Sequence, residues 1–174
     1  MEKKFNSVKA CAALSLIAAL VGCAAPPPAT FSPFAFDEAE YAALPTSGTG
    51  IIRGQVFSKT VGGDIKKGAG ENVVIFPATK YGTQRYQEQV LGGKLADSAP
   101  DSRYSKNVFV KISDGDGKFE FTEIPPGKYY IVSRVTWSIF EPNQFGPIER
   151  IQGGKVAREI EVKNGSVTEA ILNR

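Results

Sequence analysis

The sequence has 174 residues, of which 42% are hydrophobic and 22% are charged. This composition is typical of a globular domain and excludes a disordered or collagen-like chain. The formal net charge is only +3 at pH 7 and the two signs are interspersed, so no concentrated basic surface of the kind that binds nucleic acid is predicted.

The first 22 residues differ from the rest. A basic start with Lys3, Lys4 and Lys9 is followed by a nearly continuous apolar run from Ala10 to Val21. This order indicates a secretory signal peptide, because the apolar run is too short for a membrane-spanning helix. Its removal takes away three of the 21 basic and one of the 18 acidic residues and leaves a net charge of +1.

The end of this segment, Leu20-Val21-Gly22-Cys23, resembles the processing box of bacterial lipoproteins. In that family the peptide is cut just before the cysteine, so Cys23 would become the lipidated first residue. A buried or disulfide-bonded cysteine is the alternative, but Cys11 lies in the discarded peptide and leaves Cys23 without a partner. The resemblance implies attachment to a membrane through the lipid on Cys23. Because Ala24 stands where aspartate would retain a lipoprotein in the inner membrane, we expect the outer membrane, facing the periplasm.

Residues 23–49 are predicted to form a tether and a short helix. Pro26, Pro27 and Pro28 favour an extended spacer, because proline fixes φ and lacks a backbone donor. Asp37 is expected to cap a helix that ends near Leu44. The intervening residues are too apolar for an idle linker, and they either pack on the domain or dock to a partner or to the membrane interface: Phe31, Phe34 and Phe36.

From Gly50 the chain changes to short β-type runs. Ile51 to Lys59 predicts a strand in which Gly54 marks a bulge or a close approach. The apolar run from Val73 to Phe76 is consistent with a strand that is buried on both faces. Residues 62–70 are rich in glycine and lysine and are predicted as a solvated loop, because the spacing of a phosphate-binding loop is absent.

Residues 79–106 form the first of two predicted insertions. The segment around Tyr81 and Arg85 fits a short helix that ends at Gly92-Gly93, and a polar, irregular stretch follows. Insertions of this length in a small sandwich are commonly functional or mobile. We therefore predict an interaction surface here, carried by Tyr81, Arg85, Tyr86 and Tyr104.

The centre of the chain has the clearest pattern. Asp114-Gly115-Asp116-Gly117 predicts a tight hairpin turn, because these residues tolerate positive φ. Phe119 and Phe121 then share the buried face of a strand. A turn at Ile124-Pro125-Pro126-Gly127 leads to a long strand whose core face is predicted to hold Tyr129, Ile131, Val135 and Trp137.

Residues 138–148 are predicted as a second irregular insertion that covers an end of the core. The last two strands, Lys155 to Val162 and Ser166 to Leu172, flank Asn164-Gly165, a strong hairpin signal. About seven strands with no βαβ rhythm predict an all-β fold over residues 50–174, an antiparallel β-sandwich.

Two motifs resemble a known family. Asp116-Gly117-Lys118-Phe119-Glu120-Phe121 and Ile124-Pro125-Pro126-Gly127-Lys128-Tyr129 are similar to the signature of carboxypeptidase regulatory-like domains. The resemblance extends loosely from Ile51 to Leu172 and implies a transthyretin-like or immunoglobulin-like Greek-key sandwich. The whole chain also resembles a group of proteobacterial lipoproteins of unknown role. Neither resemblance implies a ligand, because the family includes structural modules, sugar-binding relatives and accessory domains.

The sequence offers little chemistry for catalysis. It contains no histidine, which excludes the histidine-dependent metal sites of related sandwiches and a Ser-His-Asp triad. Asp114 and Asp116 suggest a calcium loop, but Lys118, Phe119 and Pro125 stand where an EF-hand needs a ligand, a glycine and a glutamate. We therefore expect no catalytic residue, no metal and no cofactor.

These observations predict a non-enzymatic, lipid-anchored module of the cell envelope that binds a protein partner. The expected contacts are the phenylalanine segment, the insertion of residues 79–106 and exposed sheet edges. The alternative is a carbohydrate-binding module for envelope polysaccharide or peptidoglycan. In that case aromatic side chains would stack on sugar rings: Tyr81, Tyr86, Tyr104 and Trp137.

Overall fold

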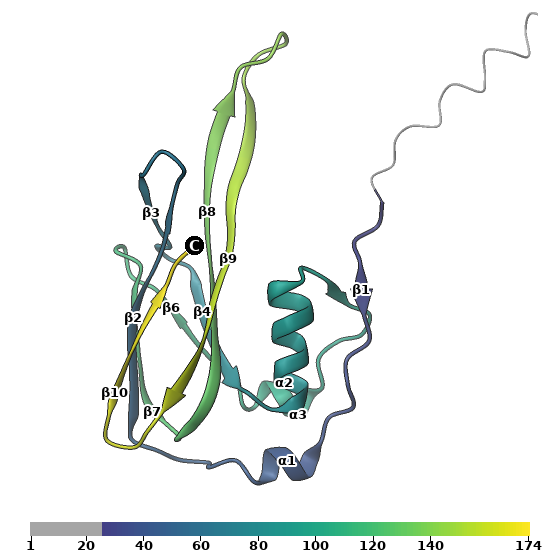
Figure 1. Cartoon of the computed structure of the whole chain (residues 1–174), viewed down its shortest axis with the longest axis vertical. Helices are drawn as coiled ribbons and strands as arrows, with labels where there is room; N and C mark the ends of the chain where they lie inside the picture. The colour runs from purple at the N-terminus through teal and green to yellow at the C-terminus, as the bar shows by residue number, and fades with distance from the viewer. Residues whose placement is uncertain (1–25) are drawn as a thin grey trace, which may run out of the picture.

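The computed structural model describes residues 26–174 and contains two packed sheets with a helical layer against one of them (Figure 1). The first sheet has the order β10-β2-β3, with β7 also paired to β2, and the second has the order β6-β4-β8-β9. The predicted all-β sandwich is therefore confirmed. Its pairs are antiparallel except that β10 runs parallel to β2. The signal peptide and Cys23 lie outside the described residues.

The first sheet consists of β2 (Gly50–Lys59), β3 (Ile65–Lys67), β7 (Lys118–Ile124) and β10 (Val167–Leu172). The second sheet consists of β4 (Asn72–Pro77), β6 (Phe109–Ile112), β8 (Gly127–Glu141) and β9 (Ile148–Val162). The helical layer contains α1 (Glu38–Ala42), α2 (Lys80–Arg85), the π-helix η1 (Tyr86–Leu91) and α3 (Ser102–Ser105). The short strands β1 (Thr30–Phe31) and β5 (Leu95–Ala96) pair in parallel beside it. None of the helices in this part of the chain is long and apolar enough to cross a membrane.

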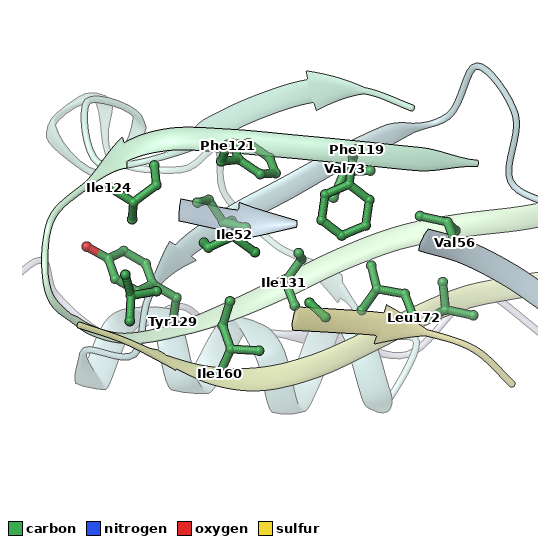
Figure 2. Close-up of a cluster of buried hydrophobic side chains, with 14 of the residues drawn as sticks. Ile52, Val56, Val73, Phe119, Phe121, Ile124, Tyr129, Ile131, Ile160 and Leu172 are labelled. Atoms are coloured by element: carbon green, nitrogen blue, oxygen red, sulfur yellow. The ribbon is translucent and has the colours of Figure 1, made fainter. Parts of the chain in front are cut away.

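The main core lies between the two sheets (Figure 2). Alternate residues of β7 and β8 point into it, as their sequence pattern predicts, and Trp137 packs at its border. Both sheets contribute its fully buried side chains, which include Ile52, Val73, Phe121, Ile131 and Leu172.

The turn at Asp114–Gly117 does not close a hairpin. The carboxylate of Asp114 accepts hydrogen bonds from the backbone N–H groups of Asp116 and Lys118, and Gly117 has a φ of 76°. However, β6 before the turn pairs with β4, and β7 after it pairs with β2. The predicted turn is right and its predicted strand pairing is wrong, because the turn carries the chain from one sheet to the other.

The turn at Asn164-Gly165 has the same role. The side-chain carbonyl of Asn164 accepts a hydrogen bond from the N–H of Thr49, and the N–H of Gly165 donates to the Thr49 hydroxyl. β9 belongs to the second sheet, whereas β10 pairs with β2 in the first. The predicted hairpin is therefore wrong, because β9 and β10 pair with strands of different sheets. The turn between them is instead hydrogen-bonded to Thr49, just before β2.

The longest hairpin lies where an irregular insertion was predicted. β8 and β9 pair continuously from Gly127 and Val162 to Glu141 and Ile148, so residues 142–147 alone form the loop. In Figure 1 this hairpin projects beyond the rest of the sandwich. The prediction for residues 138–148 is wrong, because residues 138–141 and Ile148 extend the ladder and the segment does not cover the core. The predicted loop of residues 62–70 likewise contains β3, which pairs with β2.

Candidate functional site

The insertion of residues 79–106 covers the outer face of the second sheet (Figure 1). Tyr81 is 3% exposed and packs with Tyr104 against Phe76 of β4 and Tyr130 of β8. Tyr86 is half-buried and stacks on Tyr130, with the two ring centroids 4.0 Å apart. These aromatic side chains form a second core, because the outer face of β4 and β8 is itself apolar and must be covered.

This burial corrects part of the predicted interaction surface. Tyr81, Arg85 and Tyr104 are buried, so their side chains are not exposed to a partner. Trp137 lies against the main core and is also not a free platform for a sugar ring. The helix predicted in this segment is present, as α2 and η1.

The three phenylalanines near the N-terminus divide into two groups. Phe31 is buried, and Phe36 stacks on Tyr41 with 4.4 Å between the ring centroids. Phe34 is 59% exposed. Phe31 and Phe36 therefore pack on the domain, and only Phe34 offers a free aromatic ring.

An open depression, which we name the Phe34 hollow, lies between this ring and α2. It has a volume of about 420 Å³ and is lined by Phe34, Glu40, Ala78, Lys80, Thr83, Gln84, Gln87 and Glu88. The Gln84 side chain holds residues 32–34, the segment that carries the ring and that we name the strap. Its carbonyl accepts the N–H of Phe34 at 2.6 Å, and its amide donates to the carbonyl of Ser32 at 3.1 Å.

The polar side of the Phe34 hollow combines amides and carboxylates. Glu40 accepts the backbone N–H of Lys80 at 3.0 Å, and Glu88 pairs with Lys94 at 2.5 Å. Gln87 is exposed at the same wall. An exposed ring beside such groups suits a ligand that has an apolar face and several hydroxyl groups.

A second cavity, which we name the Arg85 pocket, lies between η1 and the outer face of the second sheet. It has a volume of about 320 Å³. Val74 and Val132, which are paired in the ladder, form part of its floor. The remaining lining residues are Phe76, Arg85, Gln89, Val90, Tyr104, Val108 and Lys155.

The polar groups of the Arg85 pocket are cationic or neutral. Arg85 donates from Nη2 to the side-chain carbonyl of Gln89 at 2.8 Å, and Lys155 donates from Nζ to the backbone carbonyl of Gln89 at 2.6 Å. Desolvation and the neighbouring Arg134 lower the pKa of Lys155. Burial raises the pKa of the Tyr104 hydroxyl, which therefore stays protonated.

The two central aspartates already have partners within the domain. Asp114 accepts N–H groups of its own turn, and Asp116 pairs with Lys67 at 2.6 Å. Hydrogen bonding to Lys67 lowers the pKa of Asp116. Among residues 26–174 there is no group of three or more cysteine, aspartate or glutamate side chains arranged to hold a metal ion.

Comparisons with known proteins place the chain in a family. No protein-family model and no curated protein matches the sequence. A solved structure from Pseudomonas aeruginosa, of a protein proposed to bind carbohydrate, matches with a TM-score of 0.69. The two sequences are 32% identical, and the match covers 82% of this chain and 99% of the other. The chain belongs to the same family as this Pseudomonas aeruginosa protein.

In this chain, the sequence predicted some of the residues that line the two cavities and missed others. It singled out Phe34 and Arg85, but the lining amides Gln84 and Gln89 and the cation Lys155 were not identified. Lys155 lies 70 residues from Arg85, and only the pairing of β8 with β9 brings it to the same face. No local pattern in the sequence carries that information.

Proposed function

We propose that the protein is a lipid-anchored, non-enzymatic carbohydrate-binding module of the bacterial cell envelope. The observation that carries this proposal is the exposed ring of Phe34, held by Gln84 beside amide and carboxylate side chains. The proposed ligand class of the Pseudomonas aeruginosa relative supports the same reading. The absence of histidine from the sequence supports a role without catalysis.

The Phe34 hollow matches the two surfaces of a sugar ring. The C–H face of a pyranose would pack on the phenyl ring, while its edge hydroxyls would exchange hydrogen bonds with Gln87 and Glu88. The hollow is an open surface depression between the strap and α2, so it can accept a residue within a polysaccharide as well as a chain end.

Titration of envelope glycans tests this proposal. The purified protein is screened against bacterial polysaccharides and peptidoglycan fragments, and hits are titrated by calorimetry. Phe34→Ala is expected to weaken binding by about tenfold, because an aromatic contact contributes about 1 kcal/mol beyond area burial and its apolar area is lost as well. Phe145→Ala is the matched control, since Phe145 is 90% exposed at the distant tip of the β8–β9 hairpin. If both variants bind the glycan equally well, the sugar site lies elsewhere on the protein. If the wild-type protein binds no envelope glycan, the proposal is wrong.

A second candidate function is docking of an envelope protein, and the tip of the β8–β9 hairpin favours it. This tip carries exposed apolar side chains on a ribbon that projects from the sandwich: Phe140, Phe145, Ile148 and Ile151 (Figure 1). Apolar groups gathered on a protruding element are typical of an interaction surface. A photo-crosslinking residue at position 145 should capture a specific protein in intact cells, and capture of nothing would count against this candidate.

A further inference from the structure

We propose that the Arg85 pocket is a second binding site, which takes a small organic carboxylate with an apolar body. This site is separate from the proposed carbohydrate site, because it lies against the sheet face and shares no lining residue with the Phe34 hollow. The proposal depends on three features of the pocket: an unsatisfied buried cation, a second cation at the rim and an apolar floor.

The unsatisfied cation is Arg85. Its side chain is only 8% exposed, and Nη1 is buried without a hydrogen-bond partner among the described residues. The ion pairs formed within residues 26–174 do not include this guanidinium. A buried charge without a counterion is costly, whereas a carboxylate in the pocket, which Arg85 lines, would supply one.

The surroundings of Arg85 give it a position but not a counterion. Its guanidinium carbon lies 5.8 Å from the Tyr81 ring centroid and 5.6 Å from that of Tyr104. Together with the Nη2 bond to Gln89, these contacts hold the group in place. Neither a tyrosine ring nor a neutral amide replaces the full negative charge that the guanidinium lacks.

The rim of the pocket is also positive. Lys155 is exposed there, and the pocket continues past it into a depression of about 290 Å³ that includes Arg134. Arg134 and Lys155 are paired across β8 and β9. Glu71 is the one acidic residue that lines this extension. Three cationic side chains against one carboxylate favour an anionic ligand.

The floor excludes a purely inorganic anion as the best ligand. Five apolar side chains line the pocket, namely Val74, Phe76, Val90, Val108 and Val132. A phosphate or sulfate ion would leave these groups against water, whereas a short alkyl or aryl carboxylate would cover them. The volume of about 320 Å³ is at the small end of the range for small-molecule sites, which suits one compact acid.

Titration with octanoate tests the proposal. Calorimetry and thermal melting of the purified protein are expected to give a submillimolar dissociation constant and a rise in melting temperature. Octanamide, which has the same alkyl body without the charge, should bind roughly tenfold more weakly, as should inorganic phosphate. Equal binding of octanamide, or tighter binding of phosphate, would overturn the assigned ligand class.

Three variants separate the roles of the residues. Arg85→Gln should weaken octanoate binding at least roughly tenfold. Lys155→Gln, at the exposed rim, should weaken it by about threefold without perturbing the core, which keeps the test valid if Arg85→Gln fails to fold. Arg53→Gln is the control, because Arg53 is an exposed residue of the first sheet, where it pairs with Glu120, and the pocket lies on the second sheet.

Two outcomes would overturn the site. If folded wild-type protein fails to bind octanoate at millimolar concentration, Arg85 serves only to hold Tyr81 and Tyr104. If Lys155→Gln and Arg53→Gln bind octanoate equally well, the acid binds outside the pocket. Phe34→Ala should leave octanoate binding unchanged, so failure of the carbohydrate site and failure of this site give different results.

Discussion

At the scale of single residues, Gly54 shows how tightly the first sheet is built. β2 is flanked by β10 and β7, and Gly54 faces Ala170 on one side and Phe119 on the other. A Cβ atom at this position would stand 1.9 Å from the Ala170 carbonyl oxygen and 2.7 Å from the Phe119 ring. The sequence-based expectation of a close approach at Gly54 is therefore confirmed.

We predict that Gly54→Ala lowers the free energy of unfolding by about 2 kcal/mol, because the added carbon forces the strands apart. Urea unfolding followed by circular dichroism measures this change. Gly115→Ala is the control, since a Cβ there would meet no atom within 4 Å. That variant should stay within about 0.5 kcal/mol of the wild type, and an equal loss in both would show that packing at Gly54 is not the cause.

Asp101 gives a prediction about pH. Hydrogen bonds from the Arg103 side chain, and then from its backbone N–H, lower the pKa of Asp101 to about 2 from an ordinary value of 3.8. Because the folded-state pKa is the lower one, the stabilising contribution is complete above about pH 4 and is lost as the pH falls toward 2.

We expect Arg103→Gln to raise the pKa of Asp101 toward 3.8, although not fully, because the backbone bond remains. An NMR titration of the carboxyl carbons measures both values. The pKa of Asp116, which depends on Lys67, should not change in this variant. An unchanged pKa of Asp101 would mean that the Arg103 side chain is not its main partner in solution.

At the scale of elements, local signals predicted turns correctly and pairings poorly. Asp114 and Gly165 stand in tight turns as expected, because their side-chain bonds and positive φ are local properties. Which strands then pair depends on contacts distant in sequence, such as the bonds between Asn164 and Thr49. For this reason the fold class followed from the sequence, whereas two of the expected hairpins did not.

The same limit applies to the candidate sites. Alternation along β8 assigns Ile131 to one face and Tyr130 to the other, but it does not reveal that an insertion covers Tyr130. The aromatic residues of the segment 79–106 were therefore predicted to form an exposed interaction surface, whereas they form a second core. The exposure of Phe34 and the position of Lys155 depend equally on tertiary packing.

The β8–β9 hairpin supplies a prediction at this scale. Ser138 and Ile151 are paired, and beyond them the side chains are mostly exposed. Replacing residues 139–150 by Asn-Gly should close the ladder with a two-residue turn and change the free energy of unfolding by less than about 1 kcal/mol. Thermal and urea unfolding measure the change.

Val135→Ala serves as the matched substitution inside the packed part of β8. Val135 is buried in the main core, so this variant should lose about 2 kcal/mol. If the shortened hairpin is destabilised as much as Val135→Ala, the projecting ribbon contributes to folding and is not free for a partner. If it stays stable, the projecting ribbon is not needed for folding and is free for a partner, as the second candidate function requires.

At the scale of the whole molecule, one helical segment separates the two candidate sites. Gln84 and Gln87 face the Phe34 hollow, whereas Arg85 and Gln89 face the Arg85 pocket. Both sites therefore depend on the packing of α2 and η1 on the second sheet, through Tyr81 and Tyr86. Substitutions in this aromatic cluster should impair both sites together, whereas those of lining residues should impair one.

The proposed lipid anchor sets where these sites would act. Each buried methylene of an acyl chain contributes about 0.8 kcal/mol to membrane binding, so several chains on Cys23 would hold the protein firmly. We expect Cys23→Ser to move the protein from the membrane fraction to the soluble fraction of cells, whereas Cys11→Ser should leave it in the membrane fraction. Immunoblotting of fractionated cells measures both. Retention of Cys23→Ser in the membrane after an alkaline wash would contradict the anchor, and its release together with unchanged glycan binding would show that the anchor locates the module and takes no part in recognition.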